Sequence, residues 1–307
     1  MSHHLKGRVQ IVGSGAIGSL IAAGAQRNNI PYSLAPRRPE QLTQRLTSYS
    51  GQRLLLADNL SQAEALGPAD LLVMPLKVHQ LEDAARQWQD RLDQATPVLL
   101  VHNGMGGLES VRRHLPYQPV YQATTSHGVY KPTLEEARHS GFGRTIFGEA
   151  PDNVNLNDTQ LQIVFETISR CLQPVTWHPD ITEALWLKLV VNAVINPLTS
   201  LHDVPNGALA EHRFQPTIKH ICQEMAALMQ SEGMMFEPQL LADQVRHVID
   251  ATAQNYSSMH QDIKHRRRTE IDAINGFIVE QAQKKGIDVS VNAILYEKIK
   301  KMEAAYS

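Results

Sequence analysis

The stretch Arg8-Val-Gln-Ile-Val-Gly-Ser-Gly-Ala-Ile-Gly18 joins a β-branched run to three glycines in the spacing G-x-G-x-x-G, and residues 19–27 after it have a helical pattern. A strand, this glycine spacing and a helix in succession are typical of a dinucleotide-binding turn. Gly13 would permit the tight turn, Gly15 would let a pyrophosphate approach the backbone, and Gly18 would let the helix pack closely on the strand. The alternative is a tight turn that binds nothing.

We expect the cofactor phosphates to lie at the N-terminus of this helix, where backbone N–H groups and the helix dipole favour anions. The predicted cofactor-binding residues of the loop are Gly13, Ser14, Gly15, Ala16, Ile17 and Gly18. The next predicted strand, residues 31–35, ends at Pro36-Arg37-Arg38, where an NAD-binding chain would carry an acidic residue for the ribose 2′-hydroxyl. Two guanidiniums favour a 2′-phosphate instead, and hence NADP(H). A solvated arginine pair on a surface turn is the alternative.

Apolar runs and helical patterns continue to alternate beyond this point. Further strands are predicted at residues 70–77, 97–102, 119–127, 143–148 and 175–177, and helices at 80–92 and 158–172. The strands at 119–127 and 143–148 could extend the sheet in antiparallel fashion. After Asp180 only long helical patterns remain, so the fold class is α/β: a Rossmann-type dinucleotide-binding domain at 1–180, then an all-helical C-terminal domain at 181–307.

Polar residues follow two of the predicted strands. Lys77 ends the strand at 70–77, and Asn103-Gly-Met-Gly-Gly107 follows the strand at 97–102. Ligands of such sheets bind at the carboxyl ends of the strands, and glycines let backbone approach a ligand closely. Lys77 and Asn103 are therefore candidate cofactor contacts, although a solvated lysine and an ordinary turn remain possible. His102 and His127 are better interpreted as structural histidines.

The composition excludes several other functions. The 29 Lys+Arg and 31 Asp+Glu leave a formal net charge of −2, without the positive field that nucleic-acid binding relies on. Cys171 and Cys222 have neither disulfide-framework nor metal-ligand spacing, so no metal is expected. Residues 9–25 are apolar but broken by glycines, which fits neither a membrane span nor a signal peptide. A cytoplasmic protein without a nucleic-acid or membrane partner is the expectation.

A second informative stretch is Glu183-Ala-Leu-Trp-Leu-Lys-Leu-Val-Val-Asn-Ala-Val-Ile-Asn-Pro197. Its apolar residues recur at helical spacing, while Lys188, Asn192 and Asn196 lie four apart on another face. One stripe of the helix therefore carries an ammonium and two carboxamides, as the wall of a polar pocket would. Pro197 predicts that the helix breaks or kinks near Asn196. The alternative is a partly buried helix whose lysine reaches water.

The rest of the second half predicts four more helical segments. Helices are expected at 214–232 and 238–256, and capping boxes at 258–261 and 269–272 predict two further helix starts, the last helix running to Lys285. Ser258 would then offer a hydroxyl and free N–H groups to a carboxylate. Glu270 would lie in the first turn of the last helix, where the dipole favours its charge. The basic run at 264–268 is best interpreted as a solvated surface.

Taken together, these motifs resemble ketopantoate reductase (2-dehydropantoate 2-reductase). The resemblance runs in order through nearly the whole chain: Gly13-x-Gly15-x-x-Gly18, Leu76-Lys77, His102-Asn-Gly-Met-Gly106, Trp186-x-Lys188-x-x-x-Asn192-x-x-x-Asn196-Pro-Leu-Thr199, Asn255-x-Ser-Ser-Met259 and Thr269-Glu-Ile-Asp-x-Ile-Asn-Gly276. The last three are the most specific. The family has an N-terminal Rossmann domain and a helical domain, with the active site in the cleft between them.

The resemblance implies a role for each candidate. Lys188 would be the general acid and Glu270 a second essential catalytic residue, with Arg37 at the 2′-phosphate and Lys77 near the nicotinamide. The residues that would position the substrate are Asn103, Asn192, Asn196 and Ser258, with Asn255 close by. The reaction implied is NADPH-dependent reduction of ketopantoate to (R)-pantoate in pantothenate and coenzyme A biosynthesis, by a monomer or homodimer.

The chemistry sets a condition on the lysine. As hydride reaches the ketone carbon, charge grows on the oxygen, and the Lys188 ammonium can stabilise it and supply the proton if burial lowers its pKa towards neutrality. Since a close carboxylate opposes that shift, we expect Glu270 to accept from a substrate hydroxyl rather than to be a permanent ion partner of Lys188. The alternatives are a reductase of another branched 2-keto acid and a non-catalytic NADP(H) sensor.

Overall fold

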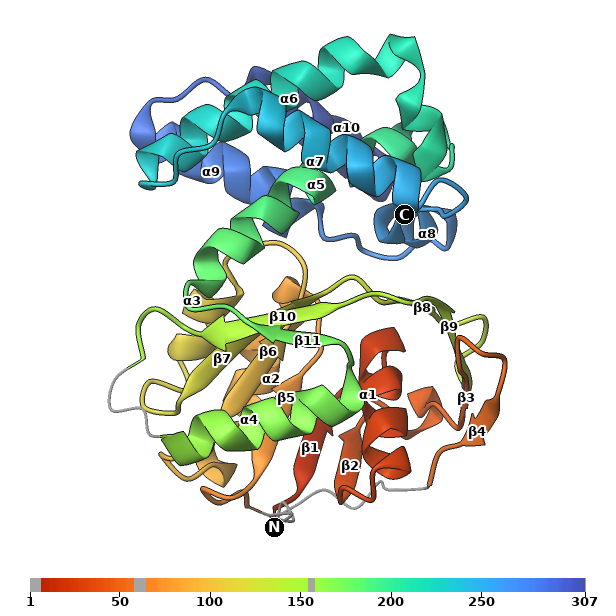
Figure 1. Ribbon diagram of the computed structural model, residues 1–307, viewed down its shortest axis with the longest axis vertical. Helices are drawn as coiled ribbons and strands as arrows, with labels where there is room; N and C mark the ends of the chain where they lie inside the picture. The colour runs from red at the N-terminus through yellow and green to blue at the C-terminus, as the bar shows by residue number, and fades with distance from the viewer. Residues whose placement is uncertain (1–6, 58–64, 154–157, 307) are drawn as a thin grey trace. The chain divides into compact units, whose positions relative to one another are not determined.

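The computed structural model describes residues 7–57, 65–153 and 158–306. The chain divides into two compact units: unit 1 comprises residues 1–102 and 107–184, and unit 2 comprises residues 103–106 and 185–307. Unit 1 holds every strand of the described residues, and unit 2 holds helices α6 to α10 together with most of α5 (Figure 1). The short segment 103–106, which follows a strand of unit 1, clusters with the helical unit.

Unit 1 is built on a seven-stranded sheet in the order β11-β10-β7-β6-β5-β1-β2. The strands are β1 (Val9–Val12), β2 (Tyr32–Ala35), β5 (Leu71–Met74), β6 (Val98–Val101), β7 (Val120–Thr125), β10 (Thr145–Glu149) and β11 (Val175–Trp177). Strands β2, β1, β5, β6 and β7 are parallel, whereas β10 runs antiparallel to β7. The predicted strands and the antiparallel extension are confirmed. Because β1 lies between β2 and β5, the strand order reverses there, which is where such sheets bind ligands.

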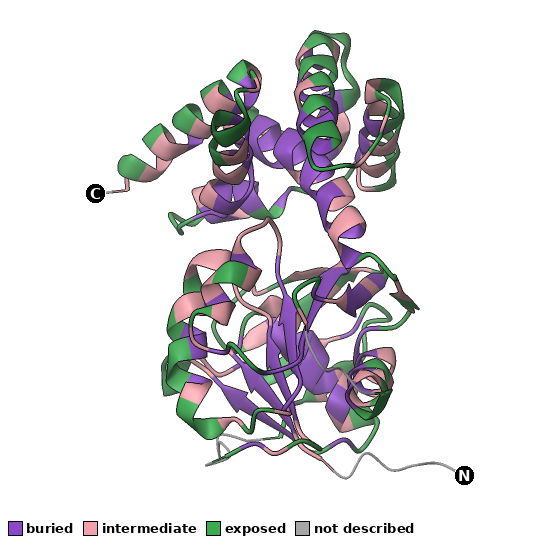
Figure 2. Ribbon diagram, turned by 90° about the vertical axis from the view of Figure 1, so that its left-hand side faces the viewer, coloured by how far each residue is buried: buried purple, intermediate pink, exposed green. Residues whose placement is uncertain are grey.

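Helices cover both faces of this sheet. Helices α1 (Ala16–Arg27) and α4 (Asp158–Cys171) cover one face, and α2 (Val78–Trp88) and α3 (Gly107–Arg112) cover the other. Leu71 and Val73 of β5 belong to the core beneath α1 and α4, while Leu72 and Met74 belong to the core beneath α2 and α3. The sheet is therefore buried on both faces, which explains why its strands are continuous apolar runs (Figure 2).

A second sheet of unit 1 has no counterpart in the sequence prediction. It has the order β4-β3-β9-β8, from β3 (Arg45–Thr47), β4 (Arg53–Leu55), β8 (Gly128–Tyr130) and β9 (Glu136–Gly141). Three of these strands have three residues, and their side chains are largely exposed or partly buried. Such strands give no apolar run or regular alternation from which a sequence pattern could be recognised.

Unit 2 is a helical bundle around α5 (Ile181–His202). The other helices are α6 (Gln215–Ser231), α7 (Pro238–Ala251), α8 (Ser258–Lys264), α9 (Asn275–Lys285) and α10 (Ser290–Ala304), with 3₁₀ turns η3 (Asn206–Ala210), η4 (His212–Phe214) and η5 (Ile271–Ala273). Helix α5 is long and apolar enough to cross a membrane by length and composition, yet 78% of its most apolar window is buried in the structure. It is apolar on most sides because the bundle packs around it.

Three predictions for unit 2 are wrong. Helix α5 does not break near Asn196 but continues through Pro197 to His202, and the predicted kink there stays a prediction. The predicted helix start at 269–272 is replaced by the short 3₁₀ turn η5 (Ile271–Ala273), and α9 begins only at Asn275, because the backbone at Ile274 is not helical. Helix α7 ends at Ala251, short of the predicted 256. The predicted helix at 214–232 and the glycine stop at Gly286, which has a φ of +66°, are confirmed.

Candidate functional site

The candidate site residues of unit 1 lie at the carboxyl ends of four neighbouring parallel strands. The glycine loop follows β1, Arg37 follows β2, Lys77 follows β5 and His102 follows β6. These strands are adjacent in the order β2-β1-β5-β6, so the segments that follow them emerge at one edge of the sheet. The structure therefore brings the predicted cofactor residues of unit 1 to the edge where α/β sheets bind ligands.

The glycine loop has the local geometry that its spacing predicts. Gly13 has a φ of +95°, and its N–H donates to the carbonyl of Ala35 at 2.8 Å. A side chain on Gly18 would come within 2.7 Å of the Gly13 oxygen, so the helix packs closely on the turn. Gly15 is exposed with open space beside it, and no side chain of the described residues caps the helix that follows. The backbone N–H groups at Ala16 and after it are thus placed to receive an anion.

A polar network beneath the loop holds its shape. The Ser14 hydroxyl is buried and accepts from the Thr43 backbone N–H at 2.6 Å, and the Ser19 hydroxyl donates to the Thr43 hydroxyl at 2.8 Å. The Lys131 ammonium donates to the carbonyls of Ser14 at 2.8 Å and Gln41 at 3.3 Å. Ser14 therefore supports the loop from inside with its side chain, and Lys131 connects the loop to the segment after β2.

The arginines after β2 are available to a ligand. Arg37 and Arg38 are exposed, and among the described residues neither guanidinium forms an ion pair. Arg38 precedes the 3₁₀ turn η1 (Pro39–Gln41), and its carbonyl accepts from the Gln41 N–H. The Lys131 ammonium donates to the Gln41 carbonyl of the same turn, and burial lowers the pKa of Lys131 to about 8.

Residues 103–106 carry Asn103 to the helical unit. The Asn103 amide donates to the Glu270 carboxylate at 3.1 Å, and the Met105 N–H donates to the Ala273 carbonyl at 2.9 Å. Gly104 has a φ of +77°, and a side chain there would come within 2.5 Å of the Ala273 oxygen. The close approach at this glycine is therefore to the backbone of Ala273, whereas Gly106 has open space beside it.

The segment that carries Glu270 is fixed from several sides. The Thr269 N–H donates to the Glu303 carboxylate at 2.6 Å, and the Thr269 hydroxyl accepts from the Ile271 N–H. Asp272 accepts from Arg268 at 3.0 Å and forms an ion pair with Lys300 at 3.1 Å, and these two contacts hold the pKa of Asp272 below its usual range despite burial. Glu270 itself is buried. A carboxylate held this rigidly can keep one orientation towards a substrate.

Lys188 lies on α5 near this carboxylate. Burial lowers the pKa of Lys188 to about 8, and the charge of Glu270 partly opposes that shift by favouring the ammonium. The shift has the direction that a general acid at neutral pH needs. Trp186, two residues earlier, packs its ring edge-on against Phe277 of α9 at 5.8 Å, which anchors this part of α5 in the bundle.

The two asparagines continue the stripe along α5. One side-chain nitrogen of Asn192 is buried, and it has no hydrogen-bond partner among the described residues. A buried amide donor without a partner costs about 1–3 kcal/mol. Asn196 is buried one turn further, so the stripe from Lys188 to Asn196 spans roughly 12 Å of helix.

Asn255 and Ser258 lie beside the N-terminus of α8, and both are exposed. The N-cap of α8 is Ser257 rather than Ser258: its hydroxyl accepts from the His260 N–H and from the Thr199 hydroxyl at 2.8 Å. The contact with Thr199 ties this end of α8 to α5. Ser258 is the first helical residue and leaves its hydroxyl at the surface.

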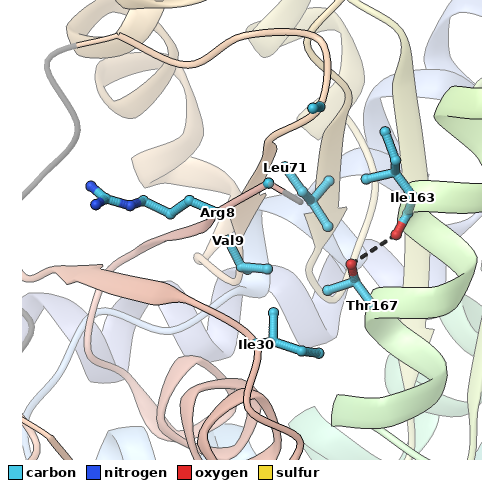
Figure 3. A pocket seen from close by; sticks show the side chains of 8 residues that line it. Arg8, Val9, Ile30, Leu71, Ile163 and Thr167 are labelled. Carbon is cyan, nitrogen blue, oxygen red and sulfur yellow. Dashed lines mark hydrogen bonds between the residues drawn. The ribbon is translucent and has the colours of Figure 1, made fainter. Parts of the chain in front are cut away.

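Two further features offer no alternative site. A shallow hollow near the amino ends of β1 and β5 is lined by Gly7, Arg8, Val9, Ile30, Ala69, Leu71, Ile163 and Thr167 (Figure 3). It lies at the opposite ends of the strands from the glycine loop, and its one hydroxyl, on Thr167, already donates to Ile163. Within the described ranges, no group of three or more His, Cys, Asp or Glu side chains could hold a metal ion.

Sequence reasoning missed Thr43, Lys131 and Asn275. Thr43 and Lys131 support the glycine loop from the second sheet and its connections, and no sequence motif indicates these contacts. Asn275 lies in the Thr269–Gly276 motif, but its contact with the α5 backbone appears only in the fold.

Known proteins match the chain over both units. The family description "Ketopantoate reductase PanE/ApbA" matches residues 9–152, and "Ketopantoate reductase PanE/ApbA C terminal" matches residues 180–303. The chain belongs to the ketopantoate reductase family. A 2-dehydropantoate 2-reductase of Vibrio cholerae is 39% identical over 299 residues, which cover 97% of this chain and 99% of that protein.

Solved structures share the fold of this family member. A probable 2-dehydropantoate 2-reductase from Bacillus subtilis has 26% identity and a TM-score of 0.79, covering 96% of this chain and 99% of the other. A D-mandelate dehydrogenase with NADH and anilino(oxo)acetate has 20% identity and a TM-score of 0.88, covering 97% and 99%. At that identity the second likeness concerns the fold alone.

Proposed function

We propose that this family member reduces ketopantoate to (R)-pantoate with NADPH, as a step of pantothenate and coenzyme A biosynthesis in the cytoplasm. The observation that carries the proposal is the Lys188 ammonium, whose pKa is lowered to about 8 beside the buried Glu270 carboxylate. A catalytic lysine and carboxylate held in this way distinguish an enzyme from a non-catalytic NADP(H) sensor. The name and identity of the Vibrio cholerae relative support the choice of substrate.

The cofactor would bind at the carboxyl edge of the unit 1 sheet. The backbone at Gly15, Ala16 and the following turn would hold the pyrophosphate, and Arg37, with Arg38 beside it, would pair with a 2′-phosphate. Lys77 follows β5 towards the nicotinamide end. The cofactor supplies the hydride, and these residues orient it.

Lys188 would donate a hydrogen bond to the ketone oxygen and then its proton to the forming alkoxide. Glu270, already holding the Asn103 amide, would accept from the substrate hydroxyl, and the buried Asn192 amide nitrogen would find its missing partner on the substrate. Asn196 and Ser258, with Asn255 close by, would complete the substrate contacts. A dimer as well as a monomer is compatible with this scheme.

The test is a coupled measurement of reaction and cofactor. Purified protein is mixed with ketopantoate and either NADPH or NADH, and loss of the reduced nicotinamide absorbance is followed. Turnover with NADPH well above that with NADH supports the proposal. Tight NADPH binding without turnover of any 2-keto acid would favour the sensor.

A second candidate is reduction of another branched 2-keto acid. The D-mandelate dehydrogenase shows that the same fold accommodates a different acid and NADH in another protein. The same assay with a panel of branched 2-keto acids decides between them: a higher kcat/KM for any of these acids than for ketopantoate would replace the first proposal.

A further inference from the structure

Pro197 creates a gap in the hydrogen-bond ladder of α5. Proline has no backbone N–H, so the carbonyl four residues earlier, that of Ala193, has no helical donor. Ala193 is fully buried in the core of unit 2, where water cannot replace the missing bond cheaply. The gap lies inside the polar stripe, between Asn192 and Asn196.

The side chain of Asn275 fills this gap. Its amide nitrogen donates to the Ala193 carbonyl at 3.2 Å, and Asn275 is fully buried as the first residue of α9. Asn275 follows Glu270 by five residues, in the segment that is fixed around η5. Asn275 therefore links the backbone of α5, which carries Lys188, to the segment that carries Glu270.

Asn275 is itself held by a series of hydrogen-bonded polar side chains. Its amide also donates to the side-chain oxygen of Asn292 at 2.9 Å, and the Asn292 amide donates to Glu224 at 2.7 Å. Glu224 further accepts from the backbone N–H groups of Val291 and Asn292. These hydrogen bonds connect α5, α9, α10 and α6. The position of Asn275 is therefore set by α9, α10 and α6, and Asn275 in turn supports α5.

We propose that Asn275 is a positioning residue of the active site, which replaces the helical hydrogen bond missing at Pro197 and so fixes Asn192 and Asn196 relative to Lys188 and Glu270. This inference rests on the proposed reduction. Lys188 and Asn192 precede the gap, whereas Asn196 and Thr199, which holds Ser257, follow it. An unpaired Ala193 carbonyl would be relieved by movement of the helix at this point, and the two halves of the stripe would shift against each other.

The experiment compares Asn275→Ala, Pro197→Ala and the double variant. Pro197→Ala restores an N–H that can donate to Ala193, so the double variant no longer needs the asparagine. We expect Asn275→Ala to raise the KM for ketopantoate on the order of tenfold and to lower Tm. NADPH affinity, set by unit 1, should stay at the wild-type value. Pro197→Ala added to Asn275→Ala should recover most of both losses.

Asn153→Ala is the matched control. It removes another asparagine amide that donates to a backbone carbonyl, that of Val120 at 2.6 Å, in unit 1. We expect a lower Tm with an unchanged KM for ketopantoate, and no recovery from Pro197→Ala. The contrast separates loss of an asparagine hydrogen bond to the backbone in general from loss of the one at the gap.

The outcomes are decisive in both directions. A double variant no better than Asn275→Ala, or an Asn275→Ala variant with wild-type KM and kcat, would overturn the proposal. If Asn275→Ala is insoluble, a soluble double variant supports the inference and an insoluble one contradicts it. If the wild type reduces no 2-keto acid, the proposed function fails, while the recovery of Tm still reports on the contact between Asn275 and Ala193.

Discussion

The glycine loop of unit 1 and the polar stripe of unit 2 differ in how much of their geometry comes from residues that are close in sequence. The loop obtains its strand, turn and helix from residues 9–27, and Thr43 and Lys131 then support it from more distant segments. In unit 2, Asn103 and Glu270 meet across 167 residues, and Asn275 reaches Ala193 across 82. A local motif can be recognised from the sequence, whereas the geometry around the stripe depends on the packing of the helical bundle.

The two regions also use different chemical groups. The glycine loop presents mainly backbone N–H groups, whereas the stripe presents an ammonium and two amides near the Glu270 carboxylate. Side-chain substitutions around the loop should therefore weaken cofactor binding moderately, and substitutions in the stripe should reduce the rate strongly. The following predictions test this contrast.

The largest effect is expected for Lys188→Ala. Loss of the general acid and of its charge should lower kcat on the order of 10²- to 10⁴-fold, because the alkoxide loses both its stabilising partner and its proton source. NADPH affinity, measured by fluorescence titration, should change little. If the variant keeps more than a third of the wild-type kcat, another group is the proton donor. The stripe would then not determine the rate.

Glu270→Gln should have the next largest effect. The substitution keeps the shape and an acceptor for Asn103 but removes the charge, and kcat/KM should fall roughly ten- to a hundredfold as a charged hydrogen bond to substrate is lost. Because the Glu270 charge raises the pKa of Lys188, the alkaline limb of the rate profile should also move to lower pH. Unchanged KM and kcat would end the assignment of Glu270 as an acceptor for substrate.

The pH dependence follows from the same lysine. Lys188 must be protonated to act, and its pKa is lowered to about 8, so kcat for reduction should fall about tenfold per unit above that pH. The stability contribution has the opposite sign: the unfolded lysine, with a pKa of about 10.4, binds more protons between those values, so this residue makes folding more favourable as pH rises there. Parallel pH profiles of kcat and Tm measure both.

The same contrast explains what could be predicted from sequence. The strands β1, β2, β5 and β6 of the main sheet were recognisable because burial makes them largely apolar runs, and Gly13 and Gly18 because only glycine fits their geometry. The second sheet was not, because its short strands are exposed. The helix end near Asn196 was wrong because a distant residue, Asn275, supplies the hydrogen bond that Pro197 lacks.

The candidate residues illustrate the limit as well. Their types and spacing along α5 identified Lys188, Asn192 and Asn196 as one stripe, and tertiary contacts then decided how each segment is held. The capping box at 269–272 was wrong because no helix begins there: the 3₁₀ turn η5 starts at Ile271, whose N–H donates to the Thr269 hydroxyl, and the Thr269 N–H donates to Glu303 of α10. No local pattern contains that contact. The two domains with bounds at residue 180, and their separate roles, stay predictions.

In unit 1, Arg37→Ala should weaken NADPH binding about tenfold or more and leave NADH binding nearly unchanged, because only NADPH carries the 2′-phosphate. Arg38→Ala is the matched variant, since both side chains are exposed after β2. Titration of each variant with 2′,5′-ADP and with 5′-AMP isolates the phosphate. Equal losses for the two nucleotides would show that Arg37 acts on the fold of the turn and not on the phosphate.

The smallest effect is expected for Lys131→Met, which keeps the length of the side chain but removes its ammonium. The contacts to the carbonyls of Ser14 and Gln41 would be lost, and the glycine loop would be less firmly joined to the turn after β2. Affinity should fall roughly two- to tenfold, and equally for NADPH and NADH, because Lys131 acts through the backbone of the loop. A loss confined to NADPH would instead place the Lys131 charge at the 2′-phosphate beside Arg37. In that case the loop would recognise its ligand with a distant side chain as well, and the contrast with the stripe of unit 2 would be one of degree.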